Sequence, residues 1–148
     1  MTTSTAATPL SAPLYGASFG QAISRFFKKY ATFSGRASRS EFWWWYLFNT
    51  IIAVVLYVIA AIGGFSGATI SETGGTQPGP GFAVALIPSV LWLLATFVPW
   101  LALAWRRLHD TNRSGGWYFI GFIPLVGGII LLVFFIMDSD PAGERFDR

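Results

Sequence analysis

The chain has 148 residues, of which 53% are hydrophobic and only 11% are charged, with a formal net charge of +3. A soluble domain of this size needs more charge to cover its surface, so these values favour a membrane protein over a water-soluble helical bundle. The sequence contains no cysteine and one histidine. It therefore excludes disulfides and thiolate chemistry and leaves few ligands for a metal, and we expect neither a metal nor a cofactor.

The first 18 residues are rich in Ala, Ser, Thr and Pro and contain no continuous apolar stretch. This composition predicts a disordered tail without a cleavable signal peptide. Residues 19–33 then carry apolar side chains at the spacing of one helix face: Phe19, Ile23, Phe26, Tyr30 and Phe33. The spacing predicts an amphipathic helix in the headgroup region, with packing on the rest of the protein as the alternative.

Three uncharged runs follow, Phe42–Ile62, Phe82–Ala104 and Trp117–Met137. Each is long enough to cross a hydrocarbon core of roughly 30 Å as a helix. Before the first run, Ser38 and Glu41 form an S-x-x-E capping box, which predicts a helix start at about Arg39. We therefore predict an all-α membrane domain over 19–137, with an interfacial helix at 19–33, three transmembrane helices at about 39–62, 82–104 and 117–137, and a polar tail at 138–148.

The distribution of Lys and Arg predicts the orientation. The segment before the first span has five, residues 105–116 have three, residues 63–81 have none and the tail has two. Three spans with a cytoplasmic N-terminus place eight of the ten in the cytoplasm. The alternative is that Pro124 and Gly127-Gly128 fold the third run into a re-entrant hairpin, which returns the tail to the cytoplasm. Such a hairpin survives only when protein covers its backbone.

Three sequence blocks carry a family resemblance: F-S-G-R-A-S-R-S-E-F-W-W-W at 33–45, R-R-L-H-D-T-N-R-S-G-G-W at 106–117 and I-P-L-V-G at 123–127. Together they resemble the domain of unknown function 805 family of small bacterial inner-membrane proteins, over about residues 26–147. The resemblance implies a multi-span helical protein of the bacterial inner membrane and implies no activity. The tail departs from the family pattern, with Glu144 and Asp147 in place of Asn and Gly.

Five arginines flank the predicted spans at one membrane face: Arg36, Arg39, Arg106, Arg107 and Arg113. A guanidinium suits phosphate, so these residues are the candidate ligands of an anionic lipid headgroup. The interpretation we favour is structural, with Glu41 capping its helix and pairing with Arg106 or Arg107. Glu41, His109 and Asp110 then form a structural polar cluster at that face.

His109 and Asp110 also suggest a general base beside a carboxylate. Adjacent helical residues do not face each other, and no nucleophile motif accompanies them, so we predict no catalytic residues.

We therefore predict a non-enzymatic membrane module that binds anionic lipid, a second copy of itself or a membrane partner, and no nucleic acid. An oligomeric transporter or channel subunit is the first alternative. The spans hold no charged residue, whereas transport pathways usually need one. An interfacial enzyme that acts on lipid headgroups is the second alternative.

Overall fold

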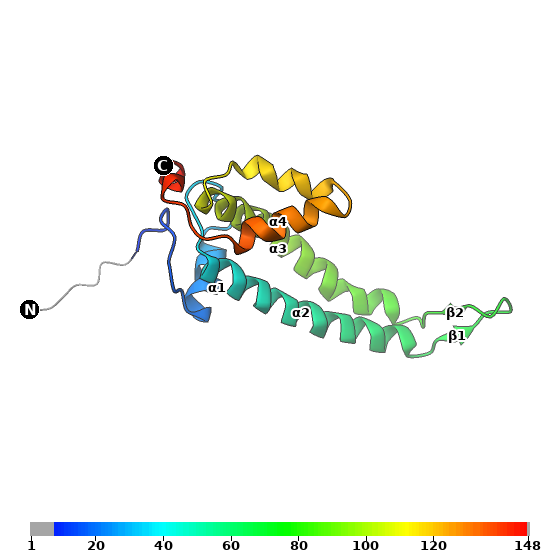
Figure 1. The fold of residues 1–148 in the computed structure, drawn as a ribbon. Coiled ribbons are helices and arrows are strands. Elements are labelled where there is room, and N and C mark those ends of the chain that lie inside the picture. Colours follow the sequence, from blue (N-terminus) through cyan, green and yellow to red (C-terminus); the bar gives the residue numbers. More distant parts are fainter. Residues whose placement is uncertain (1–7, 148) are drawn as a thin grey trace, which may run out of the picture. The chain divides into compact units, whose positions relative to one another are not determined.

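The computed structural model describes residues 8–147, and nearly all of its regular structure is helical (Figure 1). The all-α prediction is thereby confirmed. The chain forms two compact units, here called unit 1 (residues 1–46 and 98–148) and unit 2 (residues 47–97). The elements in chain order are α1 (Phe19–Lys28), α2 (Arg39–Phe65), β1 (Thr69–Ile70), β2 (Thr76–Gln77), α3 (Phe82–Asp110), the 3-10 helix η1 (Gly115–Phe122), α4 (Val126–Ile136) and the 3-10 helix η2 (Pro141–Phe146).

Among the described residues, α2 and α3 are the two helices long and apolar enough to cross a membrane, with 27 and 29 residues. Helix α2 begins at Arg39 as predicted, and the capping box is confirmed. The Glu41 amide donates to Ser38 Oγ over 3.2 Å, and the Ser38 amide donates to Glu41 Oε2 over 3.0 Å. Only 6% and 11% of the most apolar windows of α2 and α3 are buried. An apolar surface of this extent suits contact with hydrocarbon chains.

The run 117–137 does not form the single continuous helix that was predicted for it. The run 117–137 instead forms η1, a turn and α4, and α4 has 11 residues, a length of roughly 17 Å. At the turn, Pro124 lacks an amide proton and Leu125 has a φ of +67°, so the helix cannot continue. Helix α4 packs back on η1 so closely that a Cβ at Gly127 would lie 1.9 Å from the carbonyl oxygen of Ile120. The segment therefore follows a helical hairpin path, as the alternative predicted, and its place in the membrane stays a prediction.

Helix α1 ends at Lys28 and not at residue 33, and it packs on the protein by a mixed face. Arg25, Phe26 and Ala22 are buried, and the Phe26 ring stacks on Trp45. Phe19 and Phe27 are each 44% exposed. Both predicted faces of α1 are therefore divided: Phe26 is buried while Phe19 is exposed, and Arg25 points inward to a carboxylate while Lys28 is exposed.

The predicted disordered tail lies partly outside the described residues, since the structure describes it only from residue 8. Within 8–18 the structure shows a segment without regular secondary structure that bonds to the start of α2. The Leu14 amide donates to Glu41 Oε2 over 3.0 Å, and the Ala17 amide donates to Ser40 Oγ over 2.9 Å. Composition alone could not reveal these distant polar partners.

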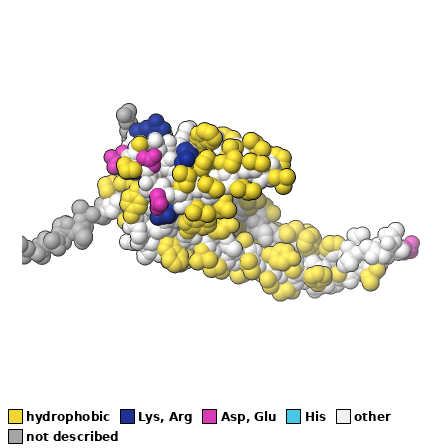
Figure 2. Space-filling view, in the orientation of Figure 1, with side chains coloured by type: hydrophobic (Ala, Val, Ile, Leu, Met, Phe, Trp, Pro, Cys, Tyr) yellow, Lys and Arg dark blue, Asp and Glu magenta, His cyan; other side chains and the backbone are white. Residues whose placement is uncertain are grey.

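Unit 2 is built almost entirely from apolar contacts. Its parts of α2 and α3 approach closely where a Cβ on Gly63 would lie 2.4 Å from the Ala85 Cβ. Trp92 Nε1 donates to Asn49 Oδ1 over 2.9 Å. Between the helices, β1 and β2 form a short antiparallel ribbon in which Thr69 pairs with Gln77. None of the ten Lys and Arg residues falls in unit 2, and Figure 2 shows the basic side chains gathered over unit 1.

Candidate functional site

Glu41 is the centre of the first ion pair in unit 1. Its Oε1 lies 2.5 Å from Arg25 Nε, and its side chain is 2% exposed. Arg25 also donates to the carbonyl of Ala12, 2.5 Å away. The predicted pairing of Glu41 with Arg106 or Arg107 is therefore wrong, because α1 brings Arg25 onto the first turn of α2. This pair holds residues 8–18, α1 and α2 together.

Asp110 is the centre of a second buried pair. Its Oδ2 lies 2.6 Å from Arg107 Nη1, and both side chains are fully buried. Arg107 also donates from Nε to the carbonyl of Phe135 and from Nη2 to that of Met137. The side chains of Tyr15 and Ser139 complete the contacts of Asp110, which therefore fixes the end of α4 to the end of α3. Sequence reasoning placed Asp110 in a structural polar cluster with Glu41 and His109 but did not identify these partners.

Arg36 forms a third pair with Asp147. Two guanidinium nitrogens reach this carboxylate, at 2.9 Å from Nε and 2.7 Å from Nη2. Hydrogen bonding to Asp147 raises the pKa of Arg36. In the sequence, Asp147 was noted only because it departs from the family pattern. In the structure its carboxylate neutralises the buried Arg36 guanidinium.

The His109 side chain packs between the backbone at Gly35 and the ring of Phe146. Its Nδ1 lies 3.0 Å from the carbonyl oxygen of Gly35, and its imidazole stacks on Phe146 with centroids 4.0 Å apart. Asp110, the next residue, bonds to Arg107, Tyr15 and Ser139 instead. The two side chains thus have separate partners, and each partner set has a structural explanation.

Two further cations, Lys29 and Arg106, are buried at 2% and 1% exposure. Within residues 8–147, Lys29 Nζ and Arg106 Nη2 have no hydrogen-bond partner. Burial lowers the pKa of Lys29 to about 8, while the nearby Glu41 carboxylate acts in the opposite direction. Sequence reasoning placed Lys29 in a basic segment and gave no signal for its burial.

The five candidate arginines therefore divide into two sets. Arg36, Arg106 and Arg107 lie in the interior, whereas Arg39 and Arg113 reach the surface. The Arg113 guanidinium lies 4.1 Å from the centroid of the Phe134 ring and donates to the carbonyl of Thr111. Arg39 is 51% exposed and pairs with Asp138, itself 87% exposed, over 2.7 Å.

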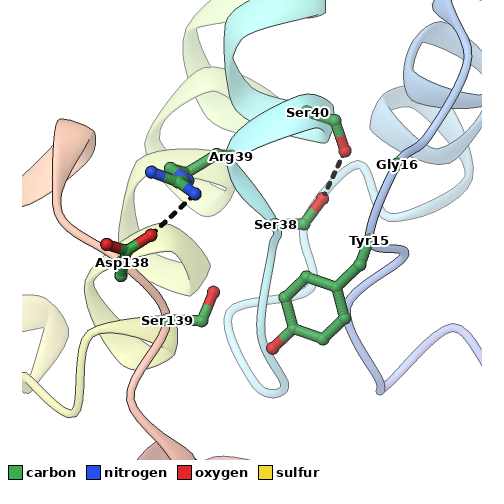
Figure 3. A pocket seen from close by; sticks show the side chains of 7 residues that line it. All are labelled: Tyr15, Gly16, Ser38, Arg39, Ser40, Asp138 and Ser139. Atoms are coloured by element: carbon green, nitrogen blue, oxygen red, sulfur yellow. Dashed lines mark hydrogen bonds and ion pairs between the residues drawn. The ribbon is translucent and has the colours of Figure 1, made fainter.

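Arg39 lines a polar pocket of about 460 Å³, here called the Arg39 pocket. Three segments of unit 1 build it: the end of residues 8–18, the first turn of α2 and the chain after α4. Figure 3 shows the Arg39–Asp138 pair at one side of the pocket and the Tyr15 ring at the other. The lining is rich in hydroxyl groups and comprises Tyr15, Gly16, Ser38, Arg39, Ser40, Asp138 and Ser139.

Sequence reasoning found Arg39 but missed Tyr15, Asp138 and Ser139. Tyr15 lies in the segment predicted to be disordered, so nothing in the pattern pointed to it. Asp138 and Ser139 follow the third apolar run, and three full spans would put them at the opposite membrane face. Only the hairpin alternative would have brought them to Arg39.

Comparison with known proteins places the chain in a family. Residues 30–148 match the family model described as protein of unknown function (DUF805). The chain is 40% identical over 119 residues to the inner membrane protein YhaI of Escherichia coli K12, covering 80% of this chain and 86% of that protein. It is 34% identical over 119 residues to the inner membrane protein YhaH of the same strain, covering 80% and 87%. No solved structure shows a significant match. The chain is a small inner membrane protein with long apolar helices and belongs to the DUF805 family.

Proposed function

We propose that this protein is a non-enzymatic inner-membrane module that binds the phosphate group of a membrane phospholipid in the Arg39 pocket. The observation that carries the proposal is the pocket itself. It places one accessible guanidinium among hydroxyl groups, at the start of a long apolar helix. The interior arginines are engaged with carboxylates and carbonyls, so their role in the proposal is to hold the pocket in shape.

Phosphate recognition at Arg39 requires guanidinium donors that a ligand can reach. The side chain is half exposed, and its partner Asp138 is more exposed still. An ion pair this exposed contributes at most about 1 kcal/mol, so a phosphate can share or replace the carboxylate at low cost. Planar guanidinium donors match phosphate oxygens in a bidentate geometry.

The charge distribution supports an orientation in which unit 1 faces the cytoplasm. If α2 and α3 are the two crossing helices, the start of α2 and the end of α3 lie on the same side of the membrane. All ten Lys and Arg residues lie at these two helix ends or in the segments before α2 and after α3. The connection between α2 and α3 carries none of them. In this arrangement the N-terminus and the C-terminal segment share the cytoplasmic side, as the positive-inside rule favours.

Transport and headgroup hydrolysis have less support. In unit 2 the polar groups of Asn49 and Thr96 bond to Trp92, through its ring nitrogen and its carbonyl oxygen. The residues considered for catalysis, His109 and Asp110, are buried in the packing of unit 1. A pore or an active site therefore has no specific observation in its favour.

The experiment is native mass spectrometry of the full chain released from mild detergent. We expect wild type to retain phospholipid and Arg39→Gln to lose it. Arg145→Gln is the matched control, since Arg145 is an exposed cation of the same unit that lies over the Phe146 ring and not in the pocket. Equal lipid retention by wild type and Arg39→Gln would refute the proposal. The same spectra report whether the protein is a monomer or a defined oligomer.

A further inference from the structure

Two hydroxyl groups that line the Arg39 pocket already donate their protons to a residue outside it. The Tyr15 hydroxyl donates to Asp110 Oδ1 over 3.1 Å, and Ser139 Oγ donates to Asp110 Oδ2 over 2.5 Å. Each oxygen keeps its lone pairs, so it can only accept a hydrogen bond from a ligand. Burial raises the pKa of Tyr15, which keeps its phenol protonated and donating at neutral pH.

The remaining polar groups reinforce this acceptor character. Ser38 Oγ donates to the carbonyl of Leu14 over 2.6 Å and accepts from the Glu41 amide over 3.2 Å, so it offers no free donor to a ligand. Asp138 adds a carboxylate at the pocket, 2.7 Å from Arg39. One cation therefore stands among several acceptors. A ligand with phosphate alone would satisfy Arg39 and leave the displaced Asp138 carboxylate without a cation.

We propose that the Arg39 pocket selects a phosphate ester that carries a primary ammonium group, the chemistry of a phosphoethanolamine headgroup. This inference rests on the proposed function, because it names the ligand class of the same pocket. The phosphate binds the Arg39 guanidinium. The ammonium donates its three hydrogens to the Asp138 carboxylate and to the Tyr15 and Ser139 oxygens.

The pocket also lies close to residues that favour the membrane boundary, where lipid headgroups are found. Trp44 and Tyr46 follow its α2 residues within two turns and are 39% and 47% exposed. Exposed Trp and Tyr side chains prefer the boundary between headgroups and hydrocarbon. A phospholipid bound at Arg39 thus has aromatic and apolar surface beside it for its acyl chains. The volume of about 460 Å³ leaves room for the headgroup.

The test uses the full chain in bilayers of equal parts phosphatidylethanolamine, phosphatidylglycerol and phosphatidylcholine, with retained lipids counted by native mass spectrometry. We expect wild type to enrich phosphatidylethanolamine roughly five- to tenfold, as one charge-assisted hydrogen bond allows. Asp138→Asn should bind lipid without this preference, and Arg39→Gln should retain little of any lipid. Glu144→Gln, which removes an exposed carboxylate outside the pocket, should behave like wild type.

The outcomes separate the two proposals. If retained lipid follows the bilayer composition in wild type and in Asp138→Asn, the ammonium inference is overturned and the phosphate proposal stands. If no retained lipid depends on Arg39, both fail. Stepwise N-methylation of phosphatidylethanolamine should weaken retention as hydrogens are lost, and unchanged retention of the trimethylated lipid would contradict the inference. Competition by soluble glycerophosphoethanolamine distinguishes a free headgroup from a membrane lipid as the source of the same chemistry.

Discussion

Units 1 and 2 differ in how they treat charge: unit 1 buries charged side chains among its apolar core, and unit 2 has very few buried side chains and no Lys or Arg. Unit 1 encloses five cations, Arg25, Lys29, Arg36, Arg106 and Arg107, which pair in part with Glu41, Asp110 and Asp147. Unit 2 contains no Lys or Arg, and its helices meet through small and apolar residues such as Gly63 and Ala85. Buried ion pairs therefore hold the segments of unit 1 together, whereas the exposed apolar helices of unit 2 require a hydrocarbon environment. Substitutions of polar groups should therefore have large effects in unit 1 and small effects in unit 2.

The largest effect is expected from Asp110→Ala. It leaves the fully buried Arg107 guanidinium without its carboxylate and frees Tyr15 and Ser139. Removing one partner of a buried pair typically costs about 3–5 kcal/mol. Thermal unfolding in detergent should show this loss, or the protein should fail to accumulate. Asp138→Asn is the control, because its exposed pair should change stability by less than about 1 kcal/mol. Similar losses for the two variants would contradict the structural role of Asp110.

Glu41→Ala should be nearly as damaging, at about 2–4 kcal/mol, because it leaves Arg25 unpaired. It also frees the amides of Leu14 and Ser38, so residues 8–18 should become sensitive to limited proteolysis. Glu41→Gln keeps an acceptor for these amides and should protect the segment better than Ala does. Equal cleavage of wild type and Glu41→Ala would show that the carboxylate does not hold this segment.

Lys29→Met should act in the opposite direction and stabilise the protein by about 1–3 kcal/mol at pH 7, since it removes a buried cation without a partner. Burial lowers the pKa of Lys29 from 10.5 to about 8. Between these values the unfolded chain binds more protons than the folded one, so wild-type stability should rise from pH 8 to pH 10.5 and this contribution should be constant below pH 8. Unfolding measured across this range should show that the rise is absent in Lys29→Met. A variant with the wild-type slope would assign the slope to another group.

The smallest effect is expected in unit 2, from Asn49→Leu. It removes the acceptor of Trp92 Nε1, and hydrogen bonds between membrane helices contribute about 0.6 kcal/mol on average. Unfolding in detergent should therefore change little. A loss as large as that of Asp110→Ala would break the contrast between the two units.

Local signals predicted the parts of the fold that depend on neighbouring residues. The start of α2 followed from Ser38 and Glu41, and two long helices followed from uncharged runs. The prediction of one helix over the third run failed because length and hydropathy do not show how Pro124 and Leu125 redirect the chain. The predicted partners of the arginines were missed for a different reason. Arg36 and Asp147 are 111 positions apart, and no periodic pattern in one sequence connects them.

Part of the candidate site was predictable for the same reason. Arg39 was found from its position beside a span, since basic residues gather at membrane faces. Tyr15 and Ser139 both donate to Asp110, and Ser139 reaches Asp110 because the chain returns after α4. A tertiary contact of this kind becomes visible only in three dimensions.

The discontinuity of unit 1 has a consequence for biosynthesis. Its first part precedes residue 47 and its second part follows residue 97, so all of unit 2 is translated between them. A ribosome that has completed unit 2 has yet to make Arg107, Asp110 and Asp147. The Arg25–Glu41 pair can form early, whereas Arg36 meets Asp110 only at the end of α3 and its closest carboxylate, Asp147, 111 residues after itself. Completion of the ion-pair network is thus a late step, and a chain arrested after α3 would lack the Arg36–Asp147 pair.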